Sequence, residues 1–286
     1  MTLKDWFIKA QAEHFALGAF NVANLETLKA VVNAATKLHS PVIVEASPGE
    51  INYLGGKNLI SLVKNIRQET NLPIFTNLDH SPDSPSAEQG LAWGFNLIHL
   101  DNSHLPFEEN LKDTQSFTQK AHQQNILVEG EFDTVTGSSS PHPNQDSQNL
   151  LSQSSFTDPL KAQQFVAATE IDTLAISIGN IHGLYQKPII LNLELLEQIR
   201  QKVNCFFSLH GGSGTQNDQI KAAIDLGIVK ININTELRLA FHESLETTLR
   251  QSQEIAIYKI MPDVITAVQK VVETKINLFG SANKIT

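Results

Sequence analysis

Residues 205–214 read CFFSLHGGSG, a short apolar run followed directly by a histidine and a glycine-rich turn. Such a run is typical of a strand in a parallel sheet, because both faces of that sheet are buried. Residues 218–226 then carry apolar positions at helical spacing. The stretch therefore predicts one unit of strand, polar loop and helix.

The same unit recurs along the chain. The runs expected to form strands are residues 18–21, 42–47, 74–79, 97–101, 126–131, 173–177, 205–210 and 229–233. The helices expected to follow them are residues 25–38, 58–70, 85–93, 106–123, 159–169, 193–202, 218–226 and 236–251. Eight such units predict an α/β fold, a (β/α)8 TIM barrel. A doubly wound open sheet is the alternative, but the turn after the first strand lacks the glycines usual in that fold.

Two segments fall outside this repeat. An extra C-terminal helix is expected at residues 263–278, packed outside the barrel or against another subunit. Residues 134–157 are rich in Ser, Gln, Asn and Pro and follow the fifth strand, which favours a mobile lid over the barrel mouth or a disordered insertion. Residues 1–286 fit a single barrel domain, although two smaller domains also suit this length.

The composition narrows the class of protein. A formal net charge of -9 argues against a nucleic acid partner. No apolar run approaches the roughly 20 residues that a membrane span needs, and the first residues do not resemble a signal peptide. Cys205 is the only cysteine, so no internal disulfide or cysteine-rich metal site can form. The sequence predicts a globular, cytoplasmic protein.

Every expected strand ends in polar residues, and barrel enzymes place their active sites at these ends. Three of the residues there are His80, His182 and His210. Three neutral imidazoles beside carboxylates suit a borderline divalent ion such as zinc, which keeps one open position when it is catalytic. We expect these histidines to bind the metal, although each alone could be a capping or surface histidine. The other histidines, His99 among them, are interpreted as structural.

Glycines mark a possible anion site. Gly183 follows His182, and Gly211, Gly212 and Ser213 follow His210 just before a helix. Free backbone amides at a helix N-terminus bind anions, and barrels often bind phosphate after the seventh and eighth strands. A simple tight turn is the alternative. The run KININT at residues 230–235 favours the phosphate site and a phosphorylated substrate.

The ordered motifs resemble those of the class II (metal-dependent) fructose- and tagatose-bisphosphate aldolases over essentially the whole chain. The matching segments are AFNV at 19–22 with NLE at 24–26, SPVI at 40–43, LDH at 78–80, DNSHLPF at 101–107, VEGE at 128–131, IGNIHG at 178–183, LHGGSG at 209–214 and KININT at 230–235. Each motif is weak by itself, but eight in this order are specific.

The resemblance implies a role for each matching residue. His80, His182 and His210 would bind a catalytic Zn²⁺, and Asp79 would transfer the C4 hydroxyl proton. Asp101 and Glu131 match carboxylates that can hold the metal in an alternative position, and a second or monovalent cation also fits the family. The positions expected to bind substrate or its phosphate are Asn21, Ser47, Gly183, Lys187, Gly211, Gly212, Ser213, Asn232, Ile233, Asn234 and Thr235.

The implied reaction is the reversible cleavage of fructose 1,6-bisphosphate or tagatose 1,6-bisphosphate to dihydroxyacetone phosphate and glyceraldehyde 3-phosphate. Such an enzyme is a lyase, and a homodimer or homotetramer is expected. Breaking the C3–C4 bond beside a ketone leaves a carbanion, which a Lewis-acidic metal stabilises. A barrel aldolase that forms a Schiff base is a rival, with Lys230 as its strand-end lysine.

The sequence departs from the family at the loop after the fifth strand. The glutamate that exchanges a proton of dihydroxyacetone phosphate would fall at or near Ser139, and a serine cannot take that role unaided. Either Asp133 or Asp146 substitutes, or the enzyme is slow, or the chain is a degenerate paralogue that only binds metal and sugar phosphate. Residues 262–265 also lack the arginine that some members use for the distal phosphate.

Overall fold

The computed structural model describes residues 1–144 and 156–285, and its centre is a closed barrel of parallel strands in the order β1-β10-β9-β7-β5-β4-β3-β2. The strands are β1 (Leu17–Asn21), β2 (Val42–Ala46), β3 (Ile74–Ser81), β4 (Leu97–Asp101), β5 (Leu127–Glu131), β7 (Thr173–Ala175), β9 (Phe206–Leu209) and β10 (Ile228–Ile233). The predicted (β/α)8 TIM barrel is confirmed, and closure between β1 and β10 excludes the open sheet.

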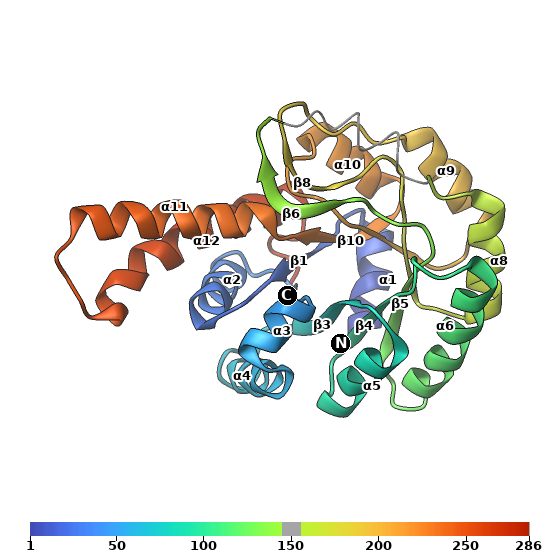
Figure 1. Cartoon of the computed structure of the whole chain (residues 1–286), viewed down its shortest axis with the longest axis horizontal. Coiled ribbons are helices and arrows are strands. Elements are labelled where there is room, and N and C mark those ends of the chain that lie inside the picture. Colours follow the sequence, from blue (N-terminus) through green and yellow to red (C-terminus); the bar gives the residue numbers. More distant parts are fainter. Residues whose placement is uncertain (145–155, 286) are drawn as a thin grey trace.

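Helices surround the barrel (Figure 1). They are α2 (Leu25–Lys37), α4 (Gly56–Thr70), α5 (Ser84–Trp93), α6 (Phe107–His122), α8 (Pro159–Thr169), α9 (Leu193–Lys202), α10 (Asn217–Asp225) and α11 (Thr235–Gln251). All eight agree with the predicted helices. Side-chain caps explain where α2, α5 and α8 begin, because Asn24, Asp83 and Asp158 each accept a backbone N–H of the first turn.

Strand alternation sorts the barrel interior into layers, because every second residue of a strand points inward. The layer nearest the N-terminal ends of the strands is apolar and contains Leu17, Ile43, Phe75 and Leu97. Two residues further along the strands lies a buried polar layer, with Glu45, Asn77, His99, Glu129, Ser208 and Lys230. Two residues further again are the strand ends. The candidate site therefore rests on a charged layer and not on an apolar one.

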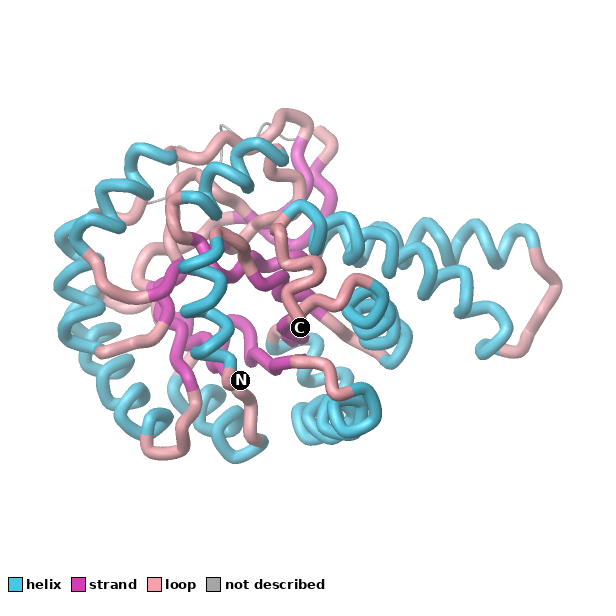
Figure 2. Tube along the Cα trace, turned by 180° about the vertical axis from the view of Figure 1, so that it is seen from behind, coloured by secondary structure: helices cyan, strands magenta, loops and turns pink. Residues whose placement is uncertain are grey.

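Within the described residues, four elements were not predicted. They are α1 (Leu3–Glu13), α3 (Pro48–Leu54), β6 (Gly137–His142) and β8 (His182–Tyr185). Helix α1 covers the N-terminal end of the barrel (Figure 2) and buries Trp6 and Phe7 against the apolar layer. Its buried positions, Leu3, Trp6, Phe7 and Ala10, do have helical spacing. That signal was available in the sequence.

Strands β6 and β8 form a separate two-stranded parallel sheet over the mouth of the barrel. Strand β6 lies inside residues 134–157, so part of this segment is ordered against β8. Its residues 145–155 lie outside the described part of the chain.

The predicted C-terminal helix is confirmed as α12 (Ile257–Leu278), which begins before the expected residue 263. Helices α11 and α12 form an antiparallel pair that extends away from the barrel, the orange-red arm in Figure 1. Helix α12 returns to pack against α2 and buries Val264, Val268 and Val272. No helix in the described residues is long and apolar enough to cross a membrane.

Candidate metal centre and active site

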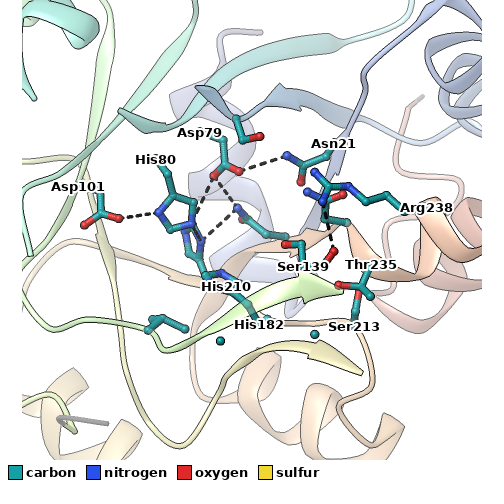
Figure 3. Close-up of a pocket in the computed structure, with 17 residues that line it drawn as sticks. Asn21, Asp79, His80, Asp101, Ser139, His182, His210, Ser213, Thr235 and Arg238 are labelled. Atoms are coloured by element: carbon teal, nitrogen blue, oxygen red, sulfur yellow. Dashed lines mark hydrogen bonds and ion pairs between the residues drawn. The ribbon is translucent and has the colours of Figure 1, made fainter. Parts of the chain in front are cut away.

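A cavity of about 420 Å³ opens at the carboxyl ends of the strands (Figure 3). The candidate residues that line it are Asn21, Ser47, Asp79, His80, Asp101, His182, Gly183, His210, Gly211, Ser213, Asn232, Asn234 and Thr235. Four other candidates, Glu131, Lys187, Gly212 and Ile233, do not line it. Asp79 and Asn232, which are 153 positions apart in the sequence, are thus brought together at one cavity, as strand-end reasoning expected.

Asp79 and His80 are adjacent in the chain, yet both reach the cavity. Neighbouring residues of a regular strand point to opposite faces. Here the pairing of β3 with β4 shifts register between Leu78 and Ser81, and His80 has a φ of 49°. A left-handed residue at a bulge re-aims a side chain, often next to an active site. The irregularity turns both side chains toward the cavity.

The histidine nitrogens match a shared metal ion. Nε2 of His80 lies 3.1 Å from Nδ1 of His210. Two nitrogens bound tetrahedrally to one zinc at about 2.0 to 2.1 Å stand about 3.3 Å apart. The ring of His182 lies 5.2 Å from that of His80 and 5.9 Å from that of His210, nearly perpendicular to each. The rings of His80 and His210 therefore suit one shared ion, and His182 lies further from both.

Two tight groups of ligand-type side chains occur among the described residues, and both contain His80. One is Asp79, His80, His99 and His210, and the other is His80, His99, Asp101 and Glu131, with ligand atoms within 4.8 Å of one another in each. His182 belongs to neither group. Completing a three-histidine site would require a small movement of the His182 ring toward the other two.

Carboxylates hold the far nitrogens of two rings. Nδ1 of His80 lies 2.7 Å from Asp101, and Nε2 of His210 lies 2.7 Å from Glu129. A carboxylate partner places the ring proton on the nitrogen it faces, which leaves the other nitrogen free for a metal. Asp101 thus orients His80 in this structure.

The protonation states agree with metal binding at two of the rings. Burial, together with His80 and His210, lowers the pKa of His182 to about 3. Burial also lowers the pKa of His210. Both rings are therefore neutral at pH 7. For His80 burial acts in the same direction, but the carboxylates of Asp79, Asp101 and Glu131 together outweigh it and raise the pKa, so a metal would compete with a proton there.

Glu131 is positioned differently from Asp101. Its Oε1 accepts the backbone N–H of Val135 at 3.1 Å, and its Oε2 lies 3.2 Å from Nε2 of His99. Nδ1 of His99 in turn accepts the backbone N–H of His80 at 3.2 Å. His99, interpreted as structural, supports the backbone of the candidate metal ligand next to it. Metal binding by Glu131 itself stays a prediction.

Asp79 is held as an ionised carboxylate in a fixed orientation. Its Oδ2 accepts from Asn21 at 3.2 Å, and its Oδ1 accepts from Asn232 at 3.1 Å. Burial alone would raise its pKa, but His80 and His99 and other nearby positive groups hold that pKa well below its ordinary value. Asp79 is therefore a carboxylate, fixed on both oxygens beside the metal histidines. It can accept the proton of a bound hydroxyl group.

A buried ion pair lies beneath the metal histidines. Nζ of Lys230 binds Glu129 at 2.8 Å and Asn232 at 2.7 Å, and Glu45 lies 3.7 Å away. Glu129 connects this lysine to His210. The carboxylates outweigh the effect of burial and raise the pKa of Lys230, which keeps it protonated. A protonated lysine outside the cavity cannot form a Schiff base, so the structure does not support the rival mechanism.

The glycine loops approach the cavity as predicted. Gly183 and Gly211 have φ values of 113° and 66°. A Cβ on Gly211 would lie 2.2 Å from the carbonyl oxygen of Ile181, so the close approach of two loops requires glycine here. Helix α11 begins at Thr235 with no side-chain cap on its N-terminus. Thr235 lines the cavity, so this helix N-terminus lies at the cavity edge, where an anion would be favourable.

The lysine that was expected to bind substrate does not line this cavity, but an arginine does. Lys187 is exposed and does not line the cavity, whereas Arg238 does. Sequence reasoning missed Arg238 because it lies in the first turns of a helix, beyond the strand end. Its position four residues after Asn234 was the available signal, since it places the side chain on the same side of the helix start.

Asp133, one of the two proposed replacements for the missing glutamate, does not line the cavity. Ser139 lines it, as the position of the substitution suggested. Burial raises the pKa of Asp133 to about 7, but Asp133 is not a lining residue. Asp146 lies outside the described residues.

Comparison with known proteins agrees with this geometry. The family described as "Fructose-bisphosphate aldolase class-II" matches residues 1–284. The structure of the YdjI aldolase from Escherichia coli K12 is 31% identical, with a TM-score of 0.85 and 100% of both chains covered. A putative fructose-1,6-biphosphate aldolase from Coccidioides immitis is 27% identical, with a TM-score of 0.86, 98% of this chain covered and 96% of the other. A fructose-bisphosphate aldolase from Campylobacter jejuni, 23% identical with a TM-score of 0.78, covers 99% of this chain and 95% of its own and supports the fold. The chain therefore belongs to the class II fructose-bisphosphate aldolases, a family of lyases.

Proposed function

We propose that this protein is a zinc-dependent ketose-bisphosphate aldolase. It reversibly cleaves fructose 1,6-bisphosphate or tagatose 1,6-bisphosphate to dihydroxyacetone phosphate and glyceraldehyde 3-phosphate. The observation that carries the proposal is the 3.1 Å approach of His80 Nε2 to His210 Nδ1. Each ring has a carboxylate on its other nitrogen, and the fixed carboxylate of Asp79 lies beside them.

The three histidines His80, His182 and His210 would hold the ion. When bound, it would polarise the substrate oxygens and stabilise the negative charge that develops as the C3–C4 bond breaks. Asp101 and Glu129 keep the rings of His80 and His210 oriented. Metal binding by Asp101 or Glu131 in an alternative position, or a second cation, is a further part of the proposal.

Asp79 takes the proton of the C4 hydroxyl in cleavage and returns it in condensation. A positioned acid or base of this kind contributes about 100- to 10,000-fold to the rate. Asn21 and Asn232 hold its two oxygens, so its lone pairs keep one orientation. Both asparagines also line the cavity and can bind substrate hydroxyl groups.

The loops after β8, β9 and β10 would bind the phosphate of dihydroxyacetone phosphate. Gly183, Gly211, Ser213 and Thr235 line the cavity and offer backbone amides or hydroxyls. Gly212 and Ile233 would act through their backbone, since their positions shape the loops. Ser47 and Asn234 are proposed as further contacts.

Ser139 favours a second candidate function. A cavity lined by serine at the position of the proton-exchanging glutamate suits a weakly active or non-catalytic paralogue that binds metal and sugar phosphate. One coupled assay separates the two. Purified protein is given each bisphosphate with zinc, with chelator, and with neither. Chelator-sensitive turnover supports the aldolase, and a full complement of zinc without turnover of either sugar supports the paralogue.

The assembly and the location of the protein stay predictions. A homodimer or homotetramer is expected, and light scattering of the purified protein would give its mass. A cytoplasmic location and a single domain over residues 1–286 are proposed on the lone cysteine and on the family match to residues 1–284.

A further inference from the structure

Arg238 contributes a permanent positive charge to the cavity. Among the described residues that line the cavity, it is the one lysine or arginine. It belongs to the first turns of α11, directly after β10. In Figure 3 its side chain lies beside Ser139 and Thr235, at the end of the cavity away from Asp101 and the metal histidines.

Glu50 fixes the position of this guanidinium. Oε1 of Glu50, a buried residue of α3, accepts from Nη2 of Arg238 at 2.7 Å. Oε2 of Glu50 accepts from the backbone N–H and the hydroxyl of Ser47 at 2.8 and 2.9 Å, and from Asn21 at 2.9 Å. These hydrogen bonds join Glu50 to the ends of β1 and β2, so its carboxylate is held in one position. The arginine is therefore held in place before any ligand arrives, which lowers the entropic cost of binding.

The guanidinium keeps donors for a ligand. It carries five N–H groups, and its bonds to described residues are those to Glu50 and, from Nη1 at 3.2 Å, to the carbonyl oxygen of Ser139. The side chain is half exposed. A planar fork with free N–H groups at a cavity wall suits an oxyanion, because arginine binds phosphate and carboxylate through paired hydrogen bonds.

We propose that Arg238 is a specificity-determining residue that binds an anionic oxygen group of the substrate, with Glu50 as the residue that positions it. The inference rests on the proposed aldolase function and adds a residue that the strand-end motifs do not contain. The anionic group has two possible sources: the phosphate of dihydroxyacetone phosphate, or an anionic group on the aldehyde.

The test compares phosphorylated and unphosphorylated ligands. Arg238→Met and Arg238→Lys are measured with two controls, Arg250→Met and Lys187→Met. Arg250 lies on the same helix but is exposed and far along it, and Lys187 is the lysine expected from the sequence to bind substrate, which does not line the cavity. Calorimetry on zinc-loaded protein gives Kd for dihydroxyacetone phosphate, dihydroxyacetone and inorganic phosphate. Condensation assays give KM for glyceraldehyde 3-phosphate and glyceraldehyde.

Arg238→Met should raise Kd or KM roughly 10- to 100-fold for the phosphorylated member of one pair, since a charged hydrogen bond is lost. The unphosphorylated member should change by less than about 2-fold, and Arg238→Lys should recover part of the loss. The pair that responds identifies the end of the substrate at Arg238. Both controls should behave as the unsubstituted protein.

Three results would overturn the proposal: equal weakening of both members of a pair, which indicates a structural role; no change in either pair; or a loss in Lys187→Met instead. A different result would contradict the proposed function. If the unsubstituted protein condenses neither aldehyde, the aldolase assignment is lost, while phosphate binding that depends on Arg238 still supports the anion site.

Discussion

At the scale of single residues, the candidate site depends on two consecutive side chains that share a cavity. Asp79 and His80 do so because of a bulge and a left-handed backbone at His80. A sequence shows which residues follow a strand, but it does not show such a bulge. Strand-end reasoning therefore found both residues without explaining how both could point inward.

Replacing Asp79 with Asn should remove the base and keep its shape. We expect kcat to fall about 100- to 10,000-fold. Zinc content should stay the same, because the three histidines are unchanged. Single-turnover kinetics and metal analysis on the same sample provide the check. A variant that loses its zinc, or that keeps full kcat, would contradict the role given to Asp79.

Cys205 should be an inert thiol. Burial raises its pKa to about 12, and Sγ lies 3.2 Å from the carbonyl oxygen of Phe206. The raised pKa means that only about one thiol in ten thousand is ionised at pH 8, and the thiolate is the form that reacts. Labelling by iodoacetamide at pH 8, followed by mass spectrometry, should be at least about 1000-fold slower in the folded chain than in urea. Similar rates in the two states would show an accessible, ionised thiol.

The residues of the buried ion pair share one position. Glu45, Glu129 and Lys230 lie inside strands that read as apolar runs, two residues before the strand ends. The charge of Lys230 pairs with Glu45 and Glu129, which lie on strands that are distant in the sequence. No local pattern reveals such a pairing. The candidate metal histidines could be predicted because they come after the apolar runs, where a polar residue is conspicuous.

At the scale of elements, the sheet of β6 and β8 brings Ser139 to the cavity. The backbone N–H of His182 donates to Thr136 at 2.8 Å, and the hydroxyl of Tyr185 donates to the carbonyl oxygen of His182 at 2.6 Å. The candidate metal ligand therefore lies on a strand of this sheet. The place of residues 134–157 after the fifth strand predicted a position over the barrel mouth. The sequence of this segment has no strand periodicity, so the pairing of β6 with β8 could not be predicted.

Gly183→Ala should disturb this sheet. A Cβ at Gly183, where φ is 113°, would lie 2.8 Å from the carbonyl oxygens of Ser138 and Ser140. Those atoms are backbone, so β6 must move away. We expect faster hydrogen exchange at residues 137–142 and a higher KM. Gly49→Ala is the matched control, because a Cβ there meets nothing within 4 Å. Unchanged exchange in the Gly183 variant would show that β6 does not depend on this close approach.

At the scale of the whole molecule, the repeat of strand and helix units was enough to predict the barrel. Eight apolar runs with intervening helical periodicity leave few other arrangements. Helix α12 was also predicted, but its partner was not. It packs on α2, more than two hundred residues earlier in the chain, and no periodicity records which surface a helix covers.

Removing the metal should affect the whole molecule. The three candidate ligands come from three separate segments, at the end of β3, in β8 and directly after β9, so an ion would join these segments. A ligand present at about 1000 times its Kd stabilises the folded state by about 4 kcal/mol. A chelator should therefore abolish activity and lower Tm, and zinc should restore both. His210→Ala should already have the lower Tm and should not respond to the chelator. A chelator-insensitive Tm in the unsubstituted protein would count against a bound ion.

The pairing of β1 with β10 also has a consequence for the order of events during synthesis. Leu17 lies opposite Lys230, so β1 cannot pair with β10 until the residues of β10 have been synthesised. Until then the growing sheet has an open edge, which can pair with other chains. Helix α12 then covers α2 from the last part of the chain. The barrel therefore closes late in synthesis. A nascent chain released before β10 is made would keep an open sheet edge.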